Sequence, residues 1–193
     1  MIKTTAMMLE ELHRYGSPKT KLTRMVDNGE IFPIVKGLYE TERSTPPHLL
    51  AGSIYGPSYI SFEYALSYYG LIPEAVYVVT CATFEKKKKK RYETLFGTFT
   101  YRDVPSEAFP LELAVMQEGD YFYRIATAEK ALCDKLYTMS PVANTKELRV
   151  LLQEDLRIEE SELRQLNTET IAMLSDKCHS TNVKKLASLL RRL

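Results

Sequence analysis

The sequence predicts an α+β protein made of two units, a small one over residues 1–43 and a larger one over residues 44–193. A polar joint with two consecutive prolines at residues 44–48 separates them. Before the joint, two short amphipathic helix patterns precede a hairpin pattern. After it, strand patterns rich in β-branched and aromatic residues alternate with helix patterns. The chain of 193 residues is 45% hydrophobic, which is enough for a sizeable core.

The first unit begins with two helices joined by a tight turn. Residues 5–15 predict the first helix, and Gly16 is a typical residue just after a helix end. The second helix is expected to begin at Pro18, because proline suits the first helical position and Ser17 before it is favoured as an N-cap. It is expected to run until Gly29 stops it. The apolar residues that these two helices would bury are Met8, Leu9, Leu12, Leu22, Met25 and Val26.

The exposed face of the second helix is basic and hydroxylated. A turn of about 100° per residue puts Thr20 and Arg24 opposite the apolar stripe. Such a face can contact phosphates and base edges in a DNA major groove, although the outward-pointing Asp27 counts against it. The predicted contact residues on this helix are Lys19, Thr20, Lys21, Thr23 and Arg24.

A hairpin follows the second helix. Residues 31–39 read as two short strands that turn at Lys36 and Gly37, which places Lys36 at a basic tip. Two helices joined by a tight turn and followed by such a hairpin are typical of a winged helix-turn-helix. The alternative is an ordinary surface helix followed by a hairpin. The order of cap, apolar stripe, glycine stop and hairpin favours DNA binding.

The second unit is predicted to be a mixed α/β domain with a helical C-terminus. A helix over residues 62–70 has Ser61 as a suitable N-cap and Gly70 as its stop. Later in the chain, Thr127 is expected to cap another helix, with Glu129 near its positive end. Three strands are expected at residues 76–80, 96–102 and 121–126.

Residues 145–193 have helical periodicity and end in a basic amphipathic segment. One interpretation is that this last helix packs back on its own unit, because its apolar stripe must be buried. The other is that it docks on a partner or on a second copy of the chain.

Six adjacent cations interrupt the second unit between two of its predicted strands. Adjacent cations cannot all be packed, so this segment is expected in an exposed loop or at the ends of a hairpin. It could contact the phosphate backbone of DNA without sequence preference. It could equally protect a strand edge from further pairing. The residues are Lys86, Lys87, Lys88, Lys89, Lys90 and Arg91.

The net charge of +1 conceals an uneven distribution along the chain. Residues 81–102 carry seven basic and two acidic groups, a net charge of +5, and residues 177–193 carry five basic groups and no acidic ones. Residues 103–176 carry seven basic and 15 acidic groups, a net charge of −8. The sequence is therefore not that of a generic polycation, and any contact with nucleic acid must be local.

Catalysis is not expected. The three histidines stand singly, and no glycine-rich phosphate-binding motif or nucleophile motif occurs. Glu129, Lys130 and Asp134 could form a nuclease-like cluster, but an ion pair four residues apart on one helix explains the last two. We predict no enzyme activity, no metal site and no cofactor.

Cysteine usage and hydropathy predict a soluble cytoplasmic protein without a membrane partner. The three cysteines are far apart, and Cys133 is expected to be a small buried hydrophobic residue. No stretch approaches the roughly 18 apolar residues of a membrane span. The apolar run at the start of the sequence is too short for a signal peptide.

Several of these segments, in this order, resemble the AbiEi family of bacterial antitoxins and transcriptional regulators. The resemblance rests on Tyr-Ile-Ser-Phe-Glu-Tyr-Ala-Leu-Ser-Tyr-Tyr-Gly-Leu-Ile-Pro-Glu at residues 59–74, followed by a Val-Val-Thr strand. It continues with Phe-Gly-Thr-Phe at residues 96–99 and Ile-Ala-Thr-Ala-Glu-Lys-Ala-Leu at residues 125–132. The hairpin at residues 29–39 is similar to the wing of that family, so the resemblance covers most of the chain.

The resemblance implies a part in a type IV toxin–antitoxin system linked to abortive infection. A winged helix would bind operator DNA with inverted repeats in its own promoter, and a second domain would oppose a nucleotidyltransferase-type toxin. Inverted repeats would need two copies of the chain on DNA. The alternative is an interaction protein or solitary regulator with little DNA binding of its own. Carried over by position, the DNA contacts would be Lys19, Thr20, Lys21, Thr23, Arg24 and, on the wing, Lys36.

Overall fold

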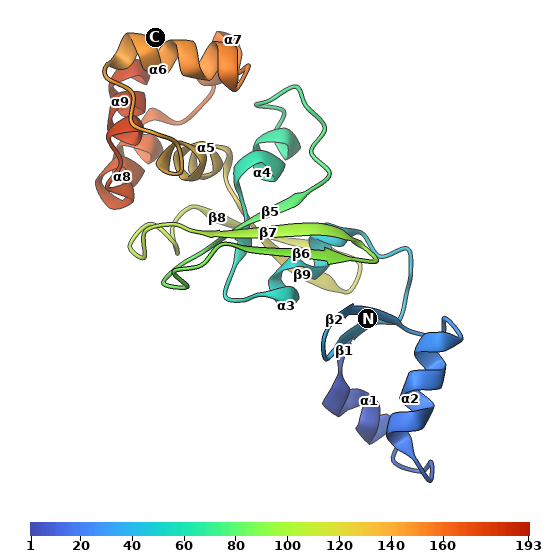
Figure 1. The fold of residues 1–193 in the computed structure, drawn as a ribbon. Coiled ribbons are helices and arrows are strands. Elements are labelled where there is room, and N and C mark those ends of the chain that lie inside the picture. The colour runs from blue at the N-terminus through green and yellow to red at the C-terminus, as the bar shows by residue number, and fades with distance from the viewer.

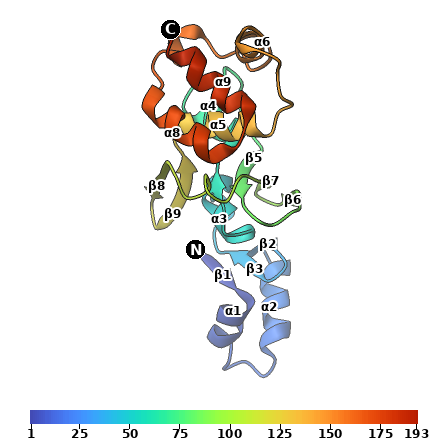
Figure 2. The ribbon, with the colours of Figure 1, turned by 90° about the vertical axis from the view of Figure 1, so that its left-hand side faces the viewer.

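The computed structural model describes residues 1–193 and has an α+β architecture of two lobes (Figure 1). The smaller N-terminal lobe lies at one end of the molecule and the C-terminal helices lie at the other, so the molecule is elongated (Figures 1 and 2). A six-stranded sheet crosses the middle.

The N-terminal lobe contains two helices and a three-stranded antiparallel sheet. Its elements are β1 (Ile2–Thr4), α1 (Thr5–Glu11), α2 (Pro18–Asp27), β2 (Phe32–Val35) and β3 (Leu38–Glu40). The strand order is β1-β3-β2, so the two helices are inserted between the first strand and the hairpin. The lobe has its own small core of Met8, Leu12, Leu22 and Ile31. The sequence did not predict β1, because three residues give no recognisable alternation.

The helices of this lobe differ slightly from their predicted bounds. α1 ends at Glu11 rather than at residue 15, and the backbone then turns before α2. α2 begins at Pro18 as predicted, and Gly29 after it has φ 68°, the left-handed conformation that glycine adopts without strain. The side chain of Ser17 does not cap α2. Its hydroxyl oxygen lies 2.8 Å from that of Thr20, a neighbour that draws it away from the backbone N–H groups.

The two lobes are joined through the smaller sheet. Ile34 of β2 is buried in the core of the larger lobe. The buried carboxylate of Glu40 on β3 accepts a hydrogen bond of 2.8 Å from the hydroxyl of Tyr121. Burial alone would raise the pKa of Glu40, but hydrogen bonds from the Met1 amino group, from Tyr121 and from the backbone lower it below its ordinary value. An apolar and a charged contact therefore reinforce the chain connection between the lobes.

The larger lobe is built on a mixed six-stranded sheet in the order β6-β7-β5-β4-β9-β8. β5 pairs in parallel with β7 and β4 in parallel with β9, and the other neighbours are antiparallel. The two edges of the sheet are β6 and β8. The strands are β4 (Tyr59–Ile60), β5 (Val79–Thr83), β6 (Lys90–Thr94), β7 (Gly97–Asp103), β8 (Leu113–Glu118) and β9 (Tyr121–Ala126).

Two of the three predicted strands lie where the sequence placed them, as β7 and β9. The strand predicted at residues 76–80 begins three residues later, at Val79, and Tyr77 before it is 85% exposed. The sequence missed β4, which is too short to show a period, and both edge strands. β6 was missed because its sequence, Lys-Arg-Tyr-Glu-Thr, is mostly charged.

The helices of the larger lobe gather on one face of the sheet, except α3 (Ala51–Ile54), which lies on the other face after a 3₁₀ turn at Pro47–Leu50 (Figures 1 and 2). The C-terminal amphipathic helix, α9, packs back on its own lobe, with Val183 and Leu186 fully buried. The helices on the covered face are α4 (Phe62–Tyr68), α5 (Ala128–Tyr137), α6 (Thr145–Val150), α7 (Glu160–Leu163), α8 (Thr168–Cys178) and α9 (Thr181–Leu190).

The predicted caps of α4 and α5 have different outcomes. Thr127 caps α5 as predicted, since its hydroxyl accepts a hydrogen bond from the Lys130 N–H. Ser61 occupies the N-cap position of α4, but its hydroxyl donates to Asp134 at 2.7 Å. The hydroxyl of Thr80, on the neighbouring strand, accepts a bond of 3.0 Å from the Tyr64 N–H in its place.

Candidate nucleic-acid interface

The exposed face of α2 has the composition that its periodicity predicts. Leu22 points into the small core, so residues on the opposite side of the helix face solvent. Lys19, Thr20, Thr23 and Arg24 are all exposed. Lys19 and Arg24 form no ion pair with any residue of the chain, so both cations are free to meet an external anion.

Lys21 differs from its neighbours because it is already engaged. Its side chain is half-buried, with Nζ 3.8 Å from a carboxylate oxygen of Glu30 and 5.7 Å from the centre of the Tyr15 ring. A solvent-screened ion pair of this kind contributes little free energy, on the order of 0–1 kcal/mol. The arrangement nevertheless directs Lys21 toward its own lobe rather than outward with Arg24.

The N-terminal end of α2 is open to solvent. No side chain caps it, and the residues in its first turn are exposed or half-buried. Uncapped N–H groups and the positive end of the helix dipole favour an anion at this position. The Thr23 hydroxyl, in contrast, donates to the Lys19 carbonyl at 3.1 Å, which leaves it only as an acceptor toward a ligand.

The hairpin tip lies against the start of α1. Lys36 is exposed and forms no ion pair, and Gly37 has φ 86°, which a two-residue turn of this kind requires. The Thr5 N–H donates to the Gly37 carbonyl at 3.0 Å, which fastens the turn to the first residue of α1. The hairpin is short, with strands of four and three residues.

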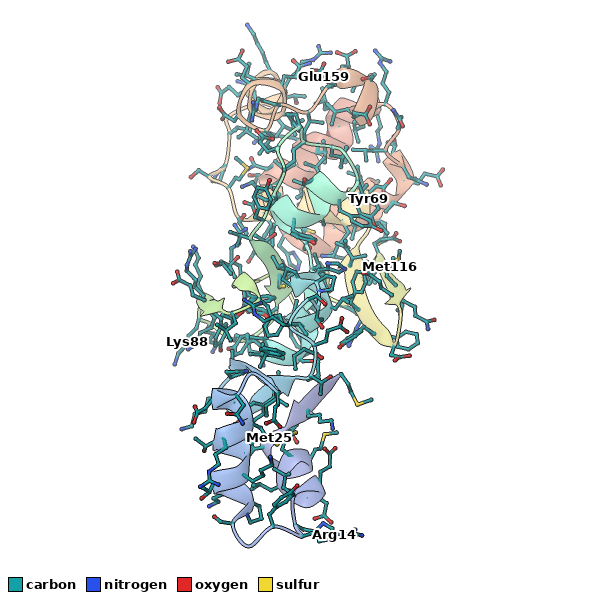
Figure 3. All side chains as sticks on the ribbon, turned by 90° about the vertical axis from the view of Figure 1, so that its right-hand side faces the viewer. Arg14, Met25, Tyr69, Lys88, Met116 and Glu159 are labelled. Carbon is teal, nitrogen blue, oxygen red and sulfur yellow. The ribbon has the colours of Figure 1, made fainter.

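One basic residue near this face was not among the predicted contacts. Arg14 is exposed in the turn between α1 and α2, at the end of the N-terminal lobe (Figure 3). It forms no ion pair. In the sequence, Arg14 lies between two predicted helices, and this position could have marked it as a further candidate contact.

The lysine segment, residues 86–91, is partly loop and partly strand. Residues 86–89 connect β5 to β6, and the last two residues begin the edge strand β6. The expectation of an exposed loop or the end of a hairpin therefore holds for all six residues, because Lys90 and Arg91 are exposed at the open end of the β6–β7 hairpin. Figure 3 places Lys88 on the same side of the molecule as α2.

Individual side chains of the lysine segment have different surroundings. Lys86 lies over the ring of Tyr55, with Nζ 5.3 Å from its centre. Lys87 is held in a left-handed conformation, φ 56°, and its N–H donates to the Asp103 carboxylate at 2.6 Å. Lys88 and Lys89 are exposed. The backbone of the loop is therefore fixed while most of its ammonium groups remain in solvent.

The residues that could have formed a nuclease-like cluster do not face a common open space. Lys130 and Asp134 form an ion pair of 2.5 Å in which neither side chain is exposed. Burial raises the pKa of Asp134, and Lys130, Ser61 and Tyr59 oppose that shift. Glu129 accepts a hydrogen bond from the Asn167 N–H at 2.9 Å.

The three cysteines, Cys81, Cys133 and Cys178, are buried away from solvent. Burial raises the pKa of each thiol, which keeps them protonated. No group of three or more histidine, cysteine, aspartate or glutamate side chains is placed to hold a metal ion. None of the helices combines the length and the apolar character that crossing a bilayer requires.

No protein-family model matches the chain, and no curated protein matches it.

Proposed function

We propose that the N-terminal lobe is a winged helix-turn-helix that binds operator DNA, and that the chain is a transcriptional repressor. The observation that carries the proposal is the α2 face, where Lys19, Thr20 and Arg24 are exposed and the two cations form no ion pair. The strand order β1-β3-β2, with both helices inserted before the hairpin, supports it further. In such a lobe the second helix enters the major groove and the hairpin contacts the adjacent backbone.

Within this proposal the basic residues have different roles. Arg24 and Thr20 read base edges, because they project furthest from the apolar stripe of α2. Lys19 and the open helix N-terminus hold a phosphate, and Lys36 and Arg14 hold others at the two ends of the lobe. Inverted repeats in the operator would recruit two copies of the chain, since each copy offers one α2.

The decisive experiment measures binding of the full chain to the DNA upstream of its gene at one fixed salt concentration. We expect the double variant Lys19→Ala/Arg24→Ala to lose at least tenfold in affinity for that DNA, because each base or phosphate contact contributes about 1–3 kcal/mol. The matched control is Lys184→Ala/Arg191→Ala, which removes the same charge from the exposed side of the C-terminal helices. Equal affinities for the wild type and the α2 variant would refute the assignment.

We further propose that the chain acts as the antitoxin of a type IV toxin–antitoxin system and counteracts a nucleotidyltransferase-type toxin. The resemblance in residues 59–74 and 125–132 supports this, and both segments belong to the larger lobe. Residues from these segments meet in one buried network, in which Asp134 accepts hydrogen bonds from Tyr59 and Ser61 and pairs with Lys130. The larger lobe is therefore the candidate for the antitoxin activity.

Co-expression separates the two activities. The Lys19→Ala/Arg24→Ala variant of the full chain is expressed with a nucleotidyltransferase encoded beside its gene, and growth is measured. Rescue as complete as that by the wild type is expected, because the variant alters only the exposed face of α2. Loss of rescue together with loss of DNA binding would mean that neutralisation acts through DNA.

A further inference from the structure

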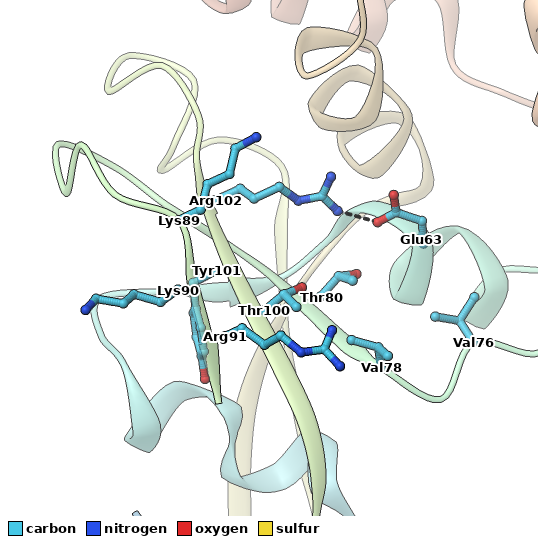
Figure 4. Close-up of a pocket in the computed structure, with 10 residues that line it drawn as sticks. All are labelled: Glu63, Val76, Val78, Thr80, Lys89, Lys90, Arg91, Thr100, Tyr101 and Arg102. Carbon is cyan, nitrogen blue, oxygen red and sulfur yellow. Dashed lines mark hydrogen bonds and ion pairs between the residues drawn. The ribbon is translucent and has the colours of Figure 1, made fainter. Parts of the chain in front are cut away.

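The larger lobe contains a basic cavity that the DNA-binding proposal does not use. It has a volume of about 480 Å³ and lies on the helix-covered face of the sheet, where β5, β7 and β6 extend beyond α4 (Figure 4). The sequence did not predict it, because the strands and the helix that form it come together only in the folded chain.

The register of the three strands explains which side chains line this cavity. Arg91 on β6 pairs with Thr100 on β7, and Thr100 pairs with Thr80 on β5, so the three form a row across the sheet (Figure 4). Arg102, two residues beyond Thr100, points to the same face, and Lys89 lies next to it from the loop before β6. Residues between these positions, such as Tyr101, point to the other face, as strand alternation requires.

The cavity has an excess of positive charge. Lys89, Arg91 and Arg102 line it, and its one acidic residue is Glu63. That carboxylate is occupied by two cations, with Arg102 at 2.5 Å and Lys135 at 2.6 Å. Burial alone would raise the pKa of Glu63, but these cations lower it below its ordinary value, so the carboxylate stays charged and paired.

The cationic side chains are held in place but not fully neutralised. The Arg102 guanidinium lies 4.2 Å from the centre of the Phe62 ring as well as against Glu63, which fixes its orientation. Arg91 uses only Nε for an exposed pair with Glu93 at 3.1 Å, so its terminal nitrogen atoms remain available. Arg91 is paired with Thr100, so Arg102, two residues further along β7, is its diagonal neighbour and both guanidinium groups face the cavity.

We propose that this cavity binds a nucleoside phosphate, with the phosphate groups held by Lys89, Arg91 and Arg102. Guanidinium groups donate paired hydrogen bonds to phosphate oxygens, and the fixed orientation of Arg102 lowers the entropic cost of binding. The apolar side chains of Val76 and Val78 line the same cavity and offer a surface for the flat base. A volume of about 480 Å³ is within the range of small-molecule sites. The proposal is independent of DNA binding by α2.

The phosphate groups that bind in the cavity could belong to a free nucleotide or to a DNA backbone, and the experiment tests each source separately. Isothermal titration calorimetry on the full chain measures binding of ATP, adenosine and inorganic tripolyphosphate, first alone and then with a saturating DNA duplex. We expect ATP to bind, adenosine not to bind, tripolyphosphate to bind more weakly than ATP, and the duplex to leave the ATP affinity unchanged.

The matched variants locate the site. Lys89→Gln/Arg91→Gln removes two cations from the cavity, and Lys86→Gln/Lys88→Gln removes two from the same segment outside it. We expect the first pair to lower the ATP affinity at least tenfold and the second to lower it less than threefold. All four residues are solvent-accessible, and thermal unfolding of each variant checks that the fold is retained.

Four results would overturn the proposal. ATP could fail to bind at millimolar concentration, or both variant pairs could lose affinity equally, which would indicate only non-specific attraction to cations. Displacement of ATP by the duplex would assign the cavity to DNA phosphates. Tripolyphosphate binding as tight as that of ATP would remove the nucleoside from the assignment.

Discussion

Lys130 is a fully buried lysine, and its surroundings explain how a charge is tolerated there. Its ammonium group lies 2.5 Å from Asp134 and 5.4 Å from the centre of the Tyr59 ring. Asp134 also accepts hydrogen bonds from the hydroxyls of Tyr59 at 2.8 Å and Ser61 at 2.7 Å. A buried ion pair is maintained only when such additional hydrogen bonds satisfy its remaining polar atoms. The network fastens α5 to β4 at the centre of the larger lobe.

Removal of one partner of this ion pair should be costly. We expect Lys130→Met to lower the free energy of unfolding by about 3–5 kcal/mol, because it leaves the Asp134 carboxylate buried and uncompensated. Urea denaturation at pH 7 measures the loss. The exposed Lys146→Met is the control, expected to change stability by less than about 0.5 kcal/mol.

The pH dependence of the same variant tests the cause. Burial already raises the pKa of Asp134, and loss of Lys130 removes one of the groups that oppose this. An acid with a raised pKa in the folded state destabilises the fold as the pH rises from the unfolded pKa to the folded one. The loss should therefore be smaller at pH 5 than at pH 7. A loss of the same size at both pH values would point to packing rather than charge.

At the scale of helices and strands, the residue that follows α8 has a strained backbone. α8 ends at Cys178, and the next residue, His179, has φ 50° and ψ 32°, the left-handed conformation that glycine usually adopts after a helix. The side chain of His179 is mostly exposed, 3.7 Å from the Glu107 carboxylate. It therefore contributes little packing in return for the strained backbone.

Replacement of this histidine should stabilise the protein. We expect His179→Gly to raise the free energy of unfolding by about 0.5–1 kcal/mol, because a left-handed residue with a Cβ atom costs about 1–2 kcal/mol and glycine loses part of this gain to unfolded-state entropy. Thermal or urea unfolding gives the value. His179→Ala is the matched control, since it removes the same imidazole and keeps the Cβ atom. A rise of equal size in both variants would attribute the effect to the side chain instead.

Helices and strands whose hydrophobic period is visible within one short segment could be predicted from the sequence. The period of α2 is enough to place Thr20 and Arg24 on the exposed side, and the alternation of β9 is enough to find it. Ser61 shows the limit of this reasoning. Its type and position are those of an N-cap, but Asp134, 73 residues away in the chain, takes its hydroxyl. A local pattern does not contain that competing partner.

The two candidate sites also differ in whether the sequence could predict them. The α2 face lies on one helix, so its residues could be named from the sequence. The cavity depends on the pairing of Arg91 with Thr100, on the parallel pairing of β5 with β7, and on the position of Glu63 on α4. These contacts join segments that are distant in the chain, and no periodicity encodes them.

At the scale of the whole molecule, the distribution of charge matters more than the net charge of +1. The basic α2 face lies at one end of the elongated molecule and the lysine segment lies by the edge of the central sheet, whereas the C-terminal helices of residues 145–193 carry nine basic and eight acidic groups (Figures 1 and 3). A DNA duplex would therefore be attracted to the end and side that hold these two cationic surfaces rather than to the C-terminal helices, whose charges nearly cancel. When binding is local, the salt dependence of the affinity reflects only the cations that contact the DNA phosphates.

The first three residues of the lysine segment, which lie outside the cavity, should accordingly contribute to affinity for DNA but not to sequence preference. We expect Lys86→Gln/Lys87→Gln/Lys88→Gln to weaken binding of the operator and of an unrelated duplex by the same factor, because phosphate contacts carry no sequence information. The slope of log K against log salt should become shallower by up to about 0.9 for each cation removed. Fluorescence anisotropy across a salt series measures both quantities. The control, Lys184→Gln/Arg191→Gln/Arg192→Gln, removes the same charge at the far end of the molecule, and an equal change of slope there would contradict local binding.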